Sequence, residues 1–550
     1  MPSCLGPQVN RGDPLNDDVS DCQEMSDKTH LPTHDVAVIG LGPVGALLAL
    51  LLADYGLKVV VFERSLDPVV LPRAVALDGE AMRTFQRIGL ANQVSEILQP
   101  SREPDQVCFT NSQREILFGS DLAPCGPNGW RDLAFFDQPE LEVLLRQQIE
   151  SNTAIDVRLG WELIGLDTSS HEWVDLRCRE TRQEQVVDAR ARYVLGCDGA
   201  SSFVRGAAGI EWQSLGYDQD WLVVDIVTDP GADLPQTTMQ VCDPHRLTTY
   251  VCVKDPNRRW EFQLLPGETR EEMLKPKTIE GLLAPWLPAH EYSIRRAAVY
   301  QFHAATAQHW RQGRVFLAGD AAHQTPPFLG QGLNTGIRDA LNLAWKLGGV
   351  LCGGYTDSLL DSYEEEREPQ ARELVSGAMA IGQIMETLAA REAGRPDPYS
   401  SLAPPPPVGA ALVPPLQSGL FLKEQLGRPG TFVGKLIRQP TVRAALGQAG
   451  PLDDFLGLGF ALVGRTSSDL QLTPELRRAW ERLGGSMVAV DALPAQRLDH
   501  DALFDHHAAA LIRPDRYIFG VADEGCSVDR LVQSIVEQLG FSSESAPQIA

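Results

Sequence analysis

The apolar positions of the N-terminal part follow a strand–helix–strand pattern. Residues 35–40 read DVAVIG, a short apolar run typical of a buried strand, and residues 43–55 carry the pattern of an apolar helix that ends near Gly56. A second apolar run, 58–62, ends at Glu63. This pattern predicts a β-α-β unit of roughly 30 residues, the size that a dinucleotide-binding fold requires.

The pattern changes twice further along the chain. Short alternating runs between residues 221 and 300 predict an antiparallel sheet. A return to strand, loop and helix over 314–347 indicates that the first domain is discontinuous, with the sheet inserted into it. Beyond a proline-rich stretch, 402–415, new apolar runs predict a small α/β domain.

These patterns give an α/β fold class with a Rossmann-like domain, an inserted antiparallel sheet and a further C-terminal domain. The first 32 residues are polar and acidic, a composition typical of a disordered tail. The expected segments are the tail at 1–32, the discontinuous nucleotide-binding domain at 33–220 and 301–400, the substrate-binding sheet domain at 221–300, the linker at 401–418 and the C-terminal domain at 419–550.

Composition and charge exclude several classes of partner. A formal net charge of −25 disfavours nucleic acid and anionic membranes. The longest apolar run, 46–53, is far shorter than the ~20 residues that a membrane-spanning helix needs. The ten cysteines form no CxxC pair, which argues against a zinc ribbon or a redox dithiol and suits a reducing cytoplasm, where we expect the protein.

A glycine motif, GLGPVG at 40–45, opens the first predicted helix. Gly40 allows a tight turn, Gly42 lets the backbone approach a pyrophosphate, and Gly45 allows close helix–strand packing. Free N–H groups at the helix N-terminus then attract the phosphates, and a carboxylate at the end of the second strand can accept hydrogen bonds from a ribose. The residues expected to hold the nucleotide here are Gly40, Gly42, Pro43, Val44, Gly45, Glu63 and Arg64. The motif does not separate FAD from NAD.

A second block, 313–347, favours FAD. Asp320 follows a strand and Gly319, so its carboxylate can bond a polyol such as the ribityl chain, although an aspartate there also suits a helix cap. The Pro326-Pro327 pair stiffens a loop that would border the flavin ring. The N-terminus of the long helix that follows can stabilise negative charge on reduced flavin. The residues expected at the flavin are Gly319, Asp320, Gly330, Gly332, Leu333 and Asn334.

With these motifs in order, the chain resembles the class A flavoprotein aromatic hydroxylases, the para-hydroxybenzoate hydroxylase-like group. Its signatures are GLGPVG at 40–45, CDGASSFVR at 197–205 and AGDAAHQTPPFLGQGLN at 318–334. The resemblance implies that the second signature, with Asp198, serves FAD and the nicotinamide nucleotide. It further implies that Arg73 of a Pro-Arg-Ala segment lies near the flavin and that Gln138 contacts FAD.

Within that group the likeness is to the 3-(3-hydroxyphenyl)propionate/3-hydroxycinnamate hydroxylases. It rests on WLVVDIVTDP at 221–230, WEFQLLPGE at 260–268 and LLDSYEEEREP at 359–369. The C-terminal part, with LIRPDRYIFGVA at 511–522, resembles the thioredoxin-like domain of that family without its redox CxxC. The resemblance therefore implies a structural role for this domain.

The resemblance implies an activity in aromatic compound catabolism. NADH or NADPH would reduce FAD, and O₂ would form a flavin C4a-hydroperoxide that hydroxylates a phenol ortho to its hydroxyl group. The implied substrates are 3-(3-hydroxyphenyl)propionate and 3-hydroxycinnamate, converted to 2,3-dihydroxy products. The expected partners are the phenol and O₂, and a homodimer is left possible. Pro327 and His303 are the candidate catalytic residues.

Several alternatives stay open at this point. His303 and Tyr300 could assist phenol deprotonation, but a hydrogen-bonded histidine at a strand end fits as well, and His323 suits a structural or flavin-adjacent role better than that of a base. Arginines that could meet a substrate carboxylate are Arg258, Arg259, Arg295 and Arg296, although surface charges look the same in sequence. Another phenol or a polyketide would keep the chemistry. A halogenase lacks its Trp-x-Trp-x-Ile-Pro signature here, a disulfide reductase lacks a cysteine pair, and a non-hydroxylating flavoprotein would not need the whole second block.

Overall fold

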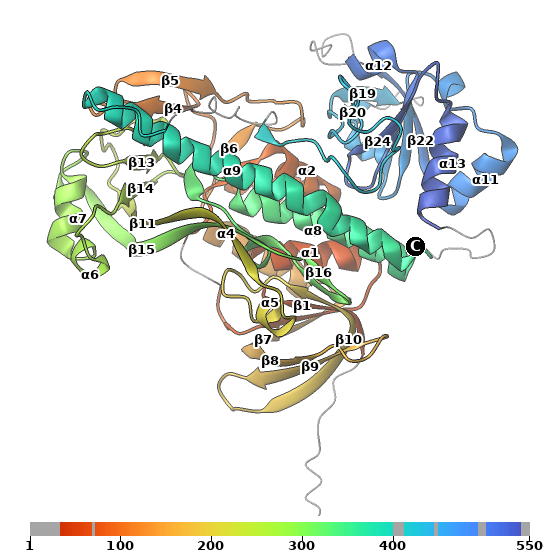
Figure 1. The fold of residues 1–550 in the computed structure, drawn as a ribbon, viewed down its shortest axis with the longest axis horizontal. Coiled ribbons are helices and arrows are strands. Elements are labelled where there is room, and N and C mark those ends of the chain that lie inside the picture. Colours follow the sequence, from red (N-terminus) through yellow and green to blue (C-terminus); the bar gives the residue numbers. More distant parts are fainter. Residues whose placement is uncertain (1–32, 69–71, 400–411, 445–448, 493–501, 541–550) are drawn as a thin grey trace, which may run out of the picture.

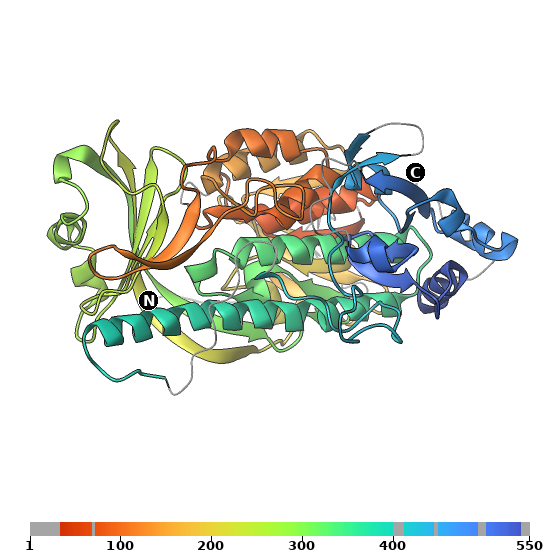
Figure 2. The ribbon, with the colours of Figure 1, turned by 90° about the horizontal axis from the view of Figure 1, so that it is seen from above.

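A computed structural model describes residues 33–68, 72–399, 412–444, 449–492 and 502–540. The predicted tail and most of the predicted linker, residues 401–411, lie outside these ranges. The molecule is elongated, with three regions side by side: an antiparallel sheet at one end, a nucleotide-binding domain in the middle and a C-terminal domain at the other end (Figures 1 and 2).

The middle region contains the predicted β-α-β unit. Its sheet has the order β16-β17-β10-β1-β2-β7, and β1, β2, β7, β10 and β17 pair in parallel. Parallel strands are covered on both faces, which explains the continuous apolar runs in the sequence. The strands are β1 (His34–Ile39), β2 (Val59–Glu63), β7 (Ile155–Leu159), β8 (Trp161–Asp167), β9 (Val174–Glu180), β10 (Val186–Gly196), β16 (Arg311–Gln312) and β17 (Val315–Leu317).

Helices cover this sheet. The first, α1 (Pro43–Asp54), packs between the sheet and α8 (Gly332–Leu351), and most of its residues are buried. The long helix α9 (Asp361–Glu392) continues past the middle region to the second sheet, where it contacts β15 (Figure 2). The remaining helices of the first two regions are α2 (Gly79–Arg87), α3 (Ala91–Ile97), α4 (Gln138–Glu150), α5 (Phe203–Ala207), α6 (Arg270–Met273) and α7 (Pro276–Leu283).

The second sheet is larger than the predicted segment 221–300. Its order is β18-β15-β11-β14-β13-β12-β4-β5. The hairpin β4–β5 comes from the segment assigned to the first domain, and the long strands β11 and β15 both extend beyond the predicted bounds. The strands are β4 (Gln106–Thr110), β5 (Ile116–Asp121), β11 (Trp212–Thr228), β12 (Thr238–Val241), β13 (Thr248–Val251), β14 (Asn257–Gln263), β15 (Tyr292–Ala307) and β18 (His323–Gln324).

The physical reason for this correction is the pairing of β4 with β12, which is parallel and joins segments about 130 residues apart. Local alternation reveals that a strand exists but not which distant strand it will pair with. A separate small sheet joins β3 (Ala76–Asp78) to β6 (Leu133–Phe135) beside the nucleotide-binding domain.

The C-terminal region forms a mixed sheet with the order β20-β19-β22-β21-β23-β24. A parallel pair, β21 and β22, is followed by the antiparallel strands β23 and β24. The elements are β19 (Thr441–Ala444), β20 (Ala449–Pro451), α10 (Asp453–Leu456), β21 (Ala461–Gly464), α11 (Pro474–Arg482), β22 (Ser486–Ala492), α12 (Ala502–His506), β23 (Ala509–Ile512), β24 (Ile518–Ala522) and α13 (Val528–Gln538). The predicted α/β class is confirmed.

A buried group of charges joins this region to α8 and α9. Glu366 accepts hydrogen bonds from Lys346 Nζ at 2.8 Å and from Arg513 Nη2 at 2.6 Å, and Arg513 also bonds Asp515 at 2.6 Å. We call these four residues the interdomain cluster. Burial alone would raise the pKa of Glu366, but Arg513 and Lys346 outweigh it and hold that pKa below its usual range. Separately, within the described ranges no helix is both long and apolar enough to cross a bilayer.

Candidate functional site

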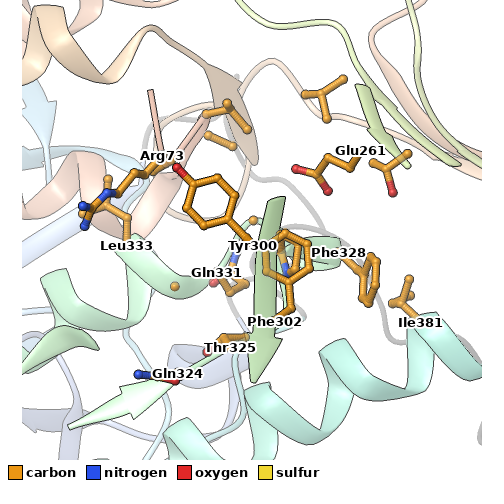
Figure 3. Close-up of a pocket in the computed structure, with 18 of the residues that line it drawn as sticks. Arg73, Glu261, Tyr300, Phe302, Gln324, Thr325, Phe328, Gln331, Leu333 and Ile381 are labelled. Carbon is orange, nitrogen blue, oxygen red and sulfur yellow. The ribbon is translucent and has the colours of Figure 1, made fainter. Parts of the chain in front are cut away.

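A cavity of about 1130 Å³ lies between the nucleotide-binding domain and the second sheet. Ordinary small-ligand pockets occupy roughly 300–1,000 Å³, so this one has room for a large cofactor and more. The nucleotide half of the cavity is lined by Gly42, Val44, Arg73, Asp320 and Leu333, among others. The sheet half is lined by Val223, Gln240, Thr249, Glu261, Tyr300 and Phe302, with Phe328 and Ile381 beside them (Figure 3).

The glycine motif has the geometry that its chemistry requires. Gly40 has φ +99°, and a Cβ at this position would lie 2.5 Å from the carbonyl oxygen of Cys197. A Cβ on Gly45 would lie 2.1 Å from the carbonyl oxygen of Gly40. At Gly42, by contrast, a Cβ would have no described atom within 4 Å. The helix α1 therefore begins at an open, uncapped end that lines the cavity, and a pyrophosphate fits there.

Glu63 accepts hydrogen bonds from backbone amides of the two loops that follow β1 and β2. Its Oε2 accepts a hydrogen bond from the Leu41 amide at 2.7 Å, and its Oε1 accepts one from the Ser65 amide at 2.8 Å. Neither Glu63 nor the exposed Arg64 is among the described residues that line the cavity. The carboxylate thus shapes the turn after β1, and its contact with a ribose stays a prediction.

Asp320 lies in a short 3₁₀ turn, Gly319–Ala321, and faces the cavity. Within the described residues its carboxylate has no hydrogen-bond partner. Burial raises the pKa of Asp320, while His323 and Arg73 oppose the rise. Asp320 is exposed to the cavity, so its carboxylate is open to a ligand that donates hydrogen bonds, as a polyol does. Gly319, with φ +61°, allows the turn.

Asp339 supports this turn from behind, a role that the sequence analysis missed. Its Oδ2 accepts a hydrogen bond from the Gly319 amide at 3.0 Å and lies 2.7 Å from His323 Nε2. Its Oδ1 accepts one from Arg367 Nε at 3.0 Å. The position of Asp339 inside a buried helix, without a neighbouring glycine or proline, gave no local signal. His323 is 1% exposed, and its contact with Asp339 agrees with a structural role.

The family residues Arg73 and Gln138 lie together. Gln138 Oε1 accepts hydrogen bonds from the Arg73 amide at 3.0 Å and the Ala74 amide at 2.6 Å, and both Gln138 and Arg73 line the cavity. Asp198 accepts from the Val204 amide at 3.1 Å, but its buried Oδ1 has no partner among the described residues. An unsatisfied buried acceptor next to the lining residues fits a hydrogen-bond donor on a cofactor.

The start of α8 is divided between the cavity and the core. Pro327, Gly330, Gly332 and Leu333 line the cavity. Asn334 is 0% exposed and lies behind the cavity wall, because its amide donates to the Ala76 and Gly330 carbonyls and accepts from the Asp78 amide. Asn334 therefore anchors the loop, whereas its direct contact with a flavin stays a prediction.

The four candidate arginines have partners within the protein. Arg259 and Arg296 line the sheet half, and their Nε atoms donate to opposite oxygens of Asp225 at 2.7 and 2.6 Å. Arg295 bonds Asp137 at 2.9 Å and Arg258 pairs with Asp255 at 2.6 Å, and both lie outside the cavity lining. The arrangement makes all four poor partners for a substrate carboxylate.

His303 and Tyr300 both line the cavity from β15. His303 is partly exposed and its Nδ1 pairs with Asp218 on the neighbouring strand. The hydroxyl of Tyr300 accepts a hydrogen bond from Arg296 at 3.1 Å, and its ring stacks beside Phe302. Their catalytic roles stay predictions.

The sequence analysis also missed Glu261, on β14. This residue is 3% exposed, lines the sheet half, and has no side-chain hydrogen bond within the described residues. Arg259 Nη1 lies 3.9 Å from its Oε1. Burial raises the pKa of Glu261 to about 7, with Arg259 opposing the rise and Asp225 adding to it. The available signal was a carboxyl between Trp260 and Phe262, the two apolar residues of β14.

Two family models and several known proteins match this chain. A family model described as an FAD binding domain matches residues 33–378, and an HcaD C-terminal domain model matches 434–538. A probable NADH-specific resorcinol 4-hydroxylase of Rhodococcus jostii (strain RHA1) is 33% identical over 91% of this chain and 94% of its own length. A 3-(3-hydroxy-phenyl)propionate/3-hydroxycinnamic acid hydroxylase of Burkholderia cenocepacia (strain HI2424) is 34% identical over 89% of this chain and 94% of its own.

This chain belongs to the FAD-dependent aromatic hydroxylases. The expected cofactor FAD and the expected monooxygenase class are thereby confirmed. The fold of this hydroxylase matches the ternary complex of aklavinone-11 hydroxylase with FAD and aklavinone, with a TM-score of 0.78 at 24% identity over 92% of this chain and 99% of that one. It also matches the flavin-dependent monooxygenase PieE, with a TM-score of 0.78 at 19% identity over 94% and 100%.

Proposed function

We propose that the protein uses NADH or NADPH and O₂ to hydroxylate a phenol ortho to its hydroxyl group. The observation that carries this proposal is a single cavity that joins the open end of α1 to an aromatic pocket on the second sheet. One end can hold the nucleotide and the other a ring. Phe302, Phe328 and Tyr300 supply the apolar wall that such a ring needs (Figure 3).

The residues of the nucleotide half have proposed tasks. Gly40, Gly42, Pro43, Val44 and Gly45 hold the pyrophosphate, Glu63 and Arg64 lie toward the ribose, and Asp320 bonds the ribityl chain. Arg73, Gln138, Asp198, Gly319, Gly330, Gly332, Leu333 and Asn334 complete the flavin pocket. Bound flavin, reduced by the nicotinamide nucleotide, supplies the oxygen transfer. The protein orients the ring and excludes water.

Pro327 and His303 are proposed to act beside the ring. Pro327 begins the short turn Pro327–Leu329 at the border between the two halves, so it limits where a ring can lie. His303 lies at the more exposed side of the same cavity with Asp218. A proton released during the reaction could leave through this pair toward solvent.

Two substrate classes have support. Relatives named 3-(3-hydroxy-phenyl)propionate/3-hydroxycinnamic acid hydroxylase favour those two phenolic acids, giving 2,3-dihydroxy products. The relative named as a resorcinol 4-hydroxylase favours a dihydroxybenzene, and the commitment of Arg259 and Arg296 to Asp225 agrees with a substrate that has no carboxylate.

The test is a panel of phenols with the purified full chain. The flavin content, O₂ uptake, NADH and NADPH oxidation and product mass would be measured with resorcinol, 3-(3-hydroxyphenyl)propionate, 3-hydroxycinnamate and larger phenols. We expect bound FAD, substrate-stimulated oxidation of the nicotinamide nucleotide and a product heavier by one oxygen. Absence of FAD, or no hydroxylated product from any phenol, would refute the proposal.

A further inference from the structure

The register of the second sheet directs one row of side chains into the cavity. Neighbouring strands align Val223, Glu261, Thr249, Gln240 and Phe109, in that order, and all five line the cavity. Two of the three polar members are already bonded. Thr249 Oγ1 donates to Gln240 Oε1 at 2.7 Å, and Gln240 Nε2 donates to the Phe328 carbonyl at 3.4 Å. The carboxyl of Glu261 is therefore the group of this row with acceptor capacity to spare.

The adjacent row carries the charges that surround Glu261. Arg259 and Arg296 both donate hydrogen bonds to Asp225. Arg259 also donates to the Arg73 carbonyl at 2.8 Å and to the Pro72 carbonyl, and Arg296 donates to the Tyr300 hydroxyl. Two arginines, one aspartate and an ionised Glu261 sum to zero charge. A substrate carboxylate placed here would add an unpaired negative charge opposite Glu261, which is costly in a buried site.

A further arginine of the described lining, Arg73, lies on the other side of Tyr300 from Glu261 (Figure 3). Figure 3 shows Arg73 and Leu333 at one end, and Glu261, Phe328 and Ile381 at the other. The carboxyl of Glu261 points into the pocket, toward the space beside Tyr300 and Phe302. A planar ring in this space has apolar walls and meets a hydrogen-bond acceptor, so the pocket suits a ring that carries hydroxyl donors.

We propose that Glu261 accepts a hydrogen bond from a hydroxyl of the substrate and takes up its proton, and that it thereby selects a neutral dihydroxybenzene over a phenolic acid. This inference rests on the proposed function. The O–H bond of the phenol breaks, the proton moves to a carboxylate oxygen of Glu261, and the oxygen's electron pair enriches the ring. One phenol, O₂, NAD(P)H and a proton give the hydroxylated phenol, water and NAD(P)⁺, so no further reactant is needed.

The surroundings predict how the role depends on pH. The groups that act electrostatically on Glu261 are Arg259 on its own strand, Asp225 and Tyr217 on β11, and Arg296 on β15. The carboxyl must be ionised to accept the proton, and its pKa of about 7 means that the ionised fraction rises through neutral pH. The value of kcat/KM should therefore increase as the pH rises past 7.

The experiment compares Glu261→Gln and Glu261→Asp with a matched control, Glu271→Gln, whose side chain is exposed on α6 outside the cavity. With the FAD-loaded full chain, we expect Glu261→Gln to lower kcat/KM for resorcinol about 100-fold, the scale of a lost acid–base group. It should also abolish the rise in kcat/KM near pH 7. Glu261→Asp should restore part of the rate, and Glu271→Gln should behave as wild type with unchanged flavin content.

A second readout concerns substrate choice. Removal of the negative charge should shift the ratio of kcat/KM for 3-(3-hydroxyphenyl)propionate to that for resorcinol at least about tenfold toward the acid, a change of ~1.4 kcal/mol. Wild-type kinetics, pH profile and substrate ratio in Glu261→Gln would overturn the inference, as would a wild-type preference for the acid.

Titration of the flavin absorbance with resorcinol separates this inference from the proposed function. A wild-type protein that binds resorcinol more tightly than Glu261→Gln, by about tenfold or more, supports the role of Glu261 even before turnover is measured. Equal dissociation constants contradict that role. Failure of every phenol to be hydroxylated contradicts the proposed function instead.

Discussion

Two buried groups of charges in this protein differ in how completely they are paired. In the interdomain cluster, Glu366 is bonded to Lys346 and Arg513, and Arg513 is bonded to Asp515. In the sheet half of the cavity, Asp225 has two arginine partners, but Glu261 has no hydrogen bond within the described residues. Both groups are almost fully buried, so the degree of exposure does not explain the difference.

The pKa values of Glu366 and Glu261 shift in opposite directions, in line with this difference in pairing. Cations outweigh burial at Glu366 and hold its pKa below the usual range, whereas burial wins at Glu261 and raises its pKa to about 7. A carboxyl with all its partners stabilises the fold. One without partners costs stability until a ligand supplies a donor, which is typical of a functional site.

The nucleotide half of the cavity shows the same contrast between one aspartate that is fully bonded and one that has no hydrogen-bond partner among the described residues. Asp339 is bonded to the Gly319 amide, His323 and Arg367, and these partners outweigh burial and lower its pKa. Asp320 faces the cavity with a raised pKa. Asp320, within the signature at 318–334, is thus the aspartate left free for a ligand, and Asp339, beyond that signature, holds the Gly319 turn in place.

The largest expected effect is on the interdomain cluster. Glu366→Ala leaves Lys346 and Arg513 buried without their shared partner, and breaking such a pair costs about 3–5 kcal/mol. Denaturant unfolding should show this loss, and the exposed neighbour Glu365→Gln should show little change. Full stability in Glu366→Ala would erase the contrast with Glu261.

At Glu261, in contrast to Glu366, we expect removal of the carboxylate to stabilise the folded protein. The pKa of Glu261 is about 7 in the folded protein, against 4.5 in the unfolded chain. Ionisation of this buried carboxyl therefore lowers the free energy of unfolding progressively as the pH rises from 4.5 through 7. The stability of Glu261→Gln relative to wild type should therefore grow by about 2–3 kcal/mol between pH 5 and pH 8. Unfolding curves at both pH values test this, and a pH-independent difference would contradict it.

The next effect concerns Asp320 and the cofactor. Asp320→Ala should weaken FAD binding about 10–100-fold, because a hydrogen bond to a charged group is worth ~1.5–3 kcal/mol. Flavin retention on gel filtration and a fluorescence titration of the apoprotein measure it. An Asp320→Ala protein with wild-type flavin affinity would show that Asp320, like Asp339, serves only the fold.

The smallest effect is expected at Arg295. Its pair with Asp137 is partly exposed and lies outside the cavity lining, so Arg295→Gln should cost about 1 kcal/mol or less and leave KM for phenolic acids within about twofold. Kinetics with 3-(3-hydroxyphenyl)propionate provide the measurement. A large rise in KM for the acid alone would indicate that Arg295 contacts the substrate carboxylate.

Much of the nucleotide half could be predicted from local sequence. The turn at Gly40, the close packing at Gly45 and the turn at Gly319 each need a residue without a side chain, and that need is met by the residue type at one position. Asp320 was expected from its short signature beside the Gly319 turn, and Arg73 was expected from the family resemblance of its Pro-Arg-Ala segment. The β-α-β unit followed from continuous apolar runs.

Glu261, Asp339 and the hairpin β4–β5 could not be predicted in the same way. Each depends on which distant segments meet: Glu261 faces the cavity because of the pairing of β11, β14 and β13, and Asp339 matters because α8 passes behind the Gly319 turn. The sequence by itself indicated the cofactor, because the backbone turns and helix ends that would hold it are local, and its resemblance to a known family implied the class of chemistry. Only the tertiary structure decided which carboxyl remains without a partner, because pairing and burial are properties of the whole fold.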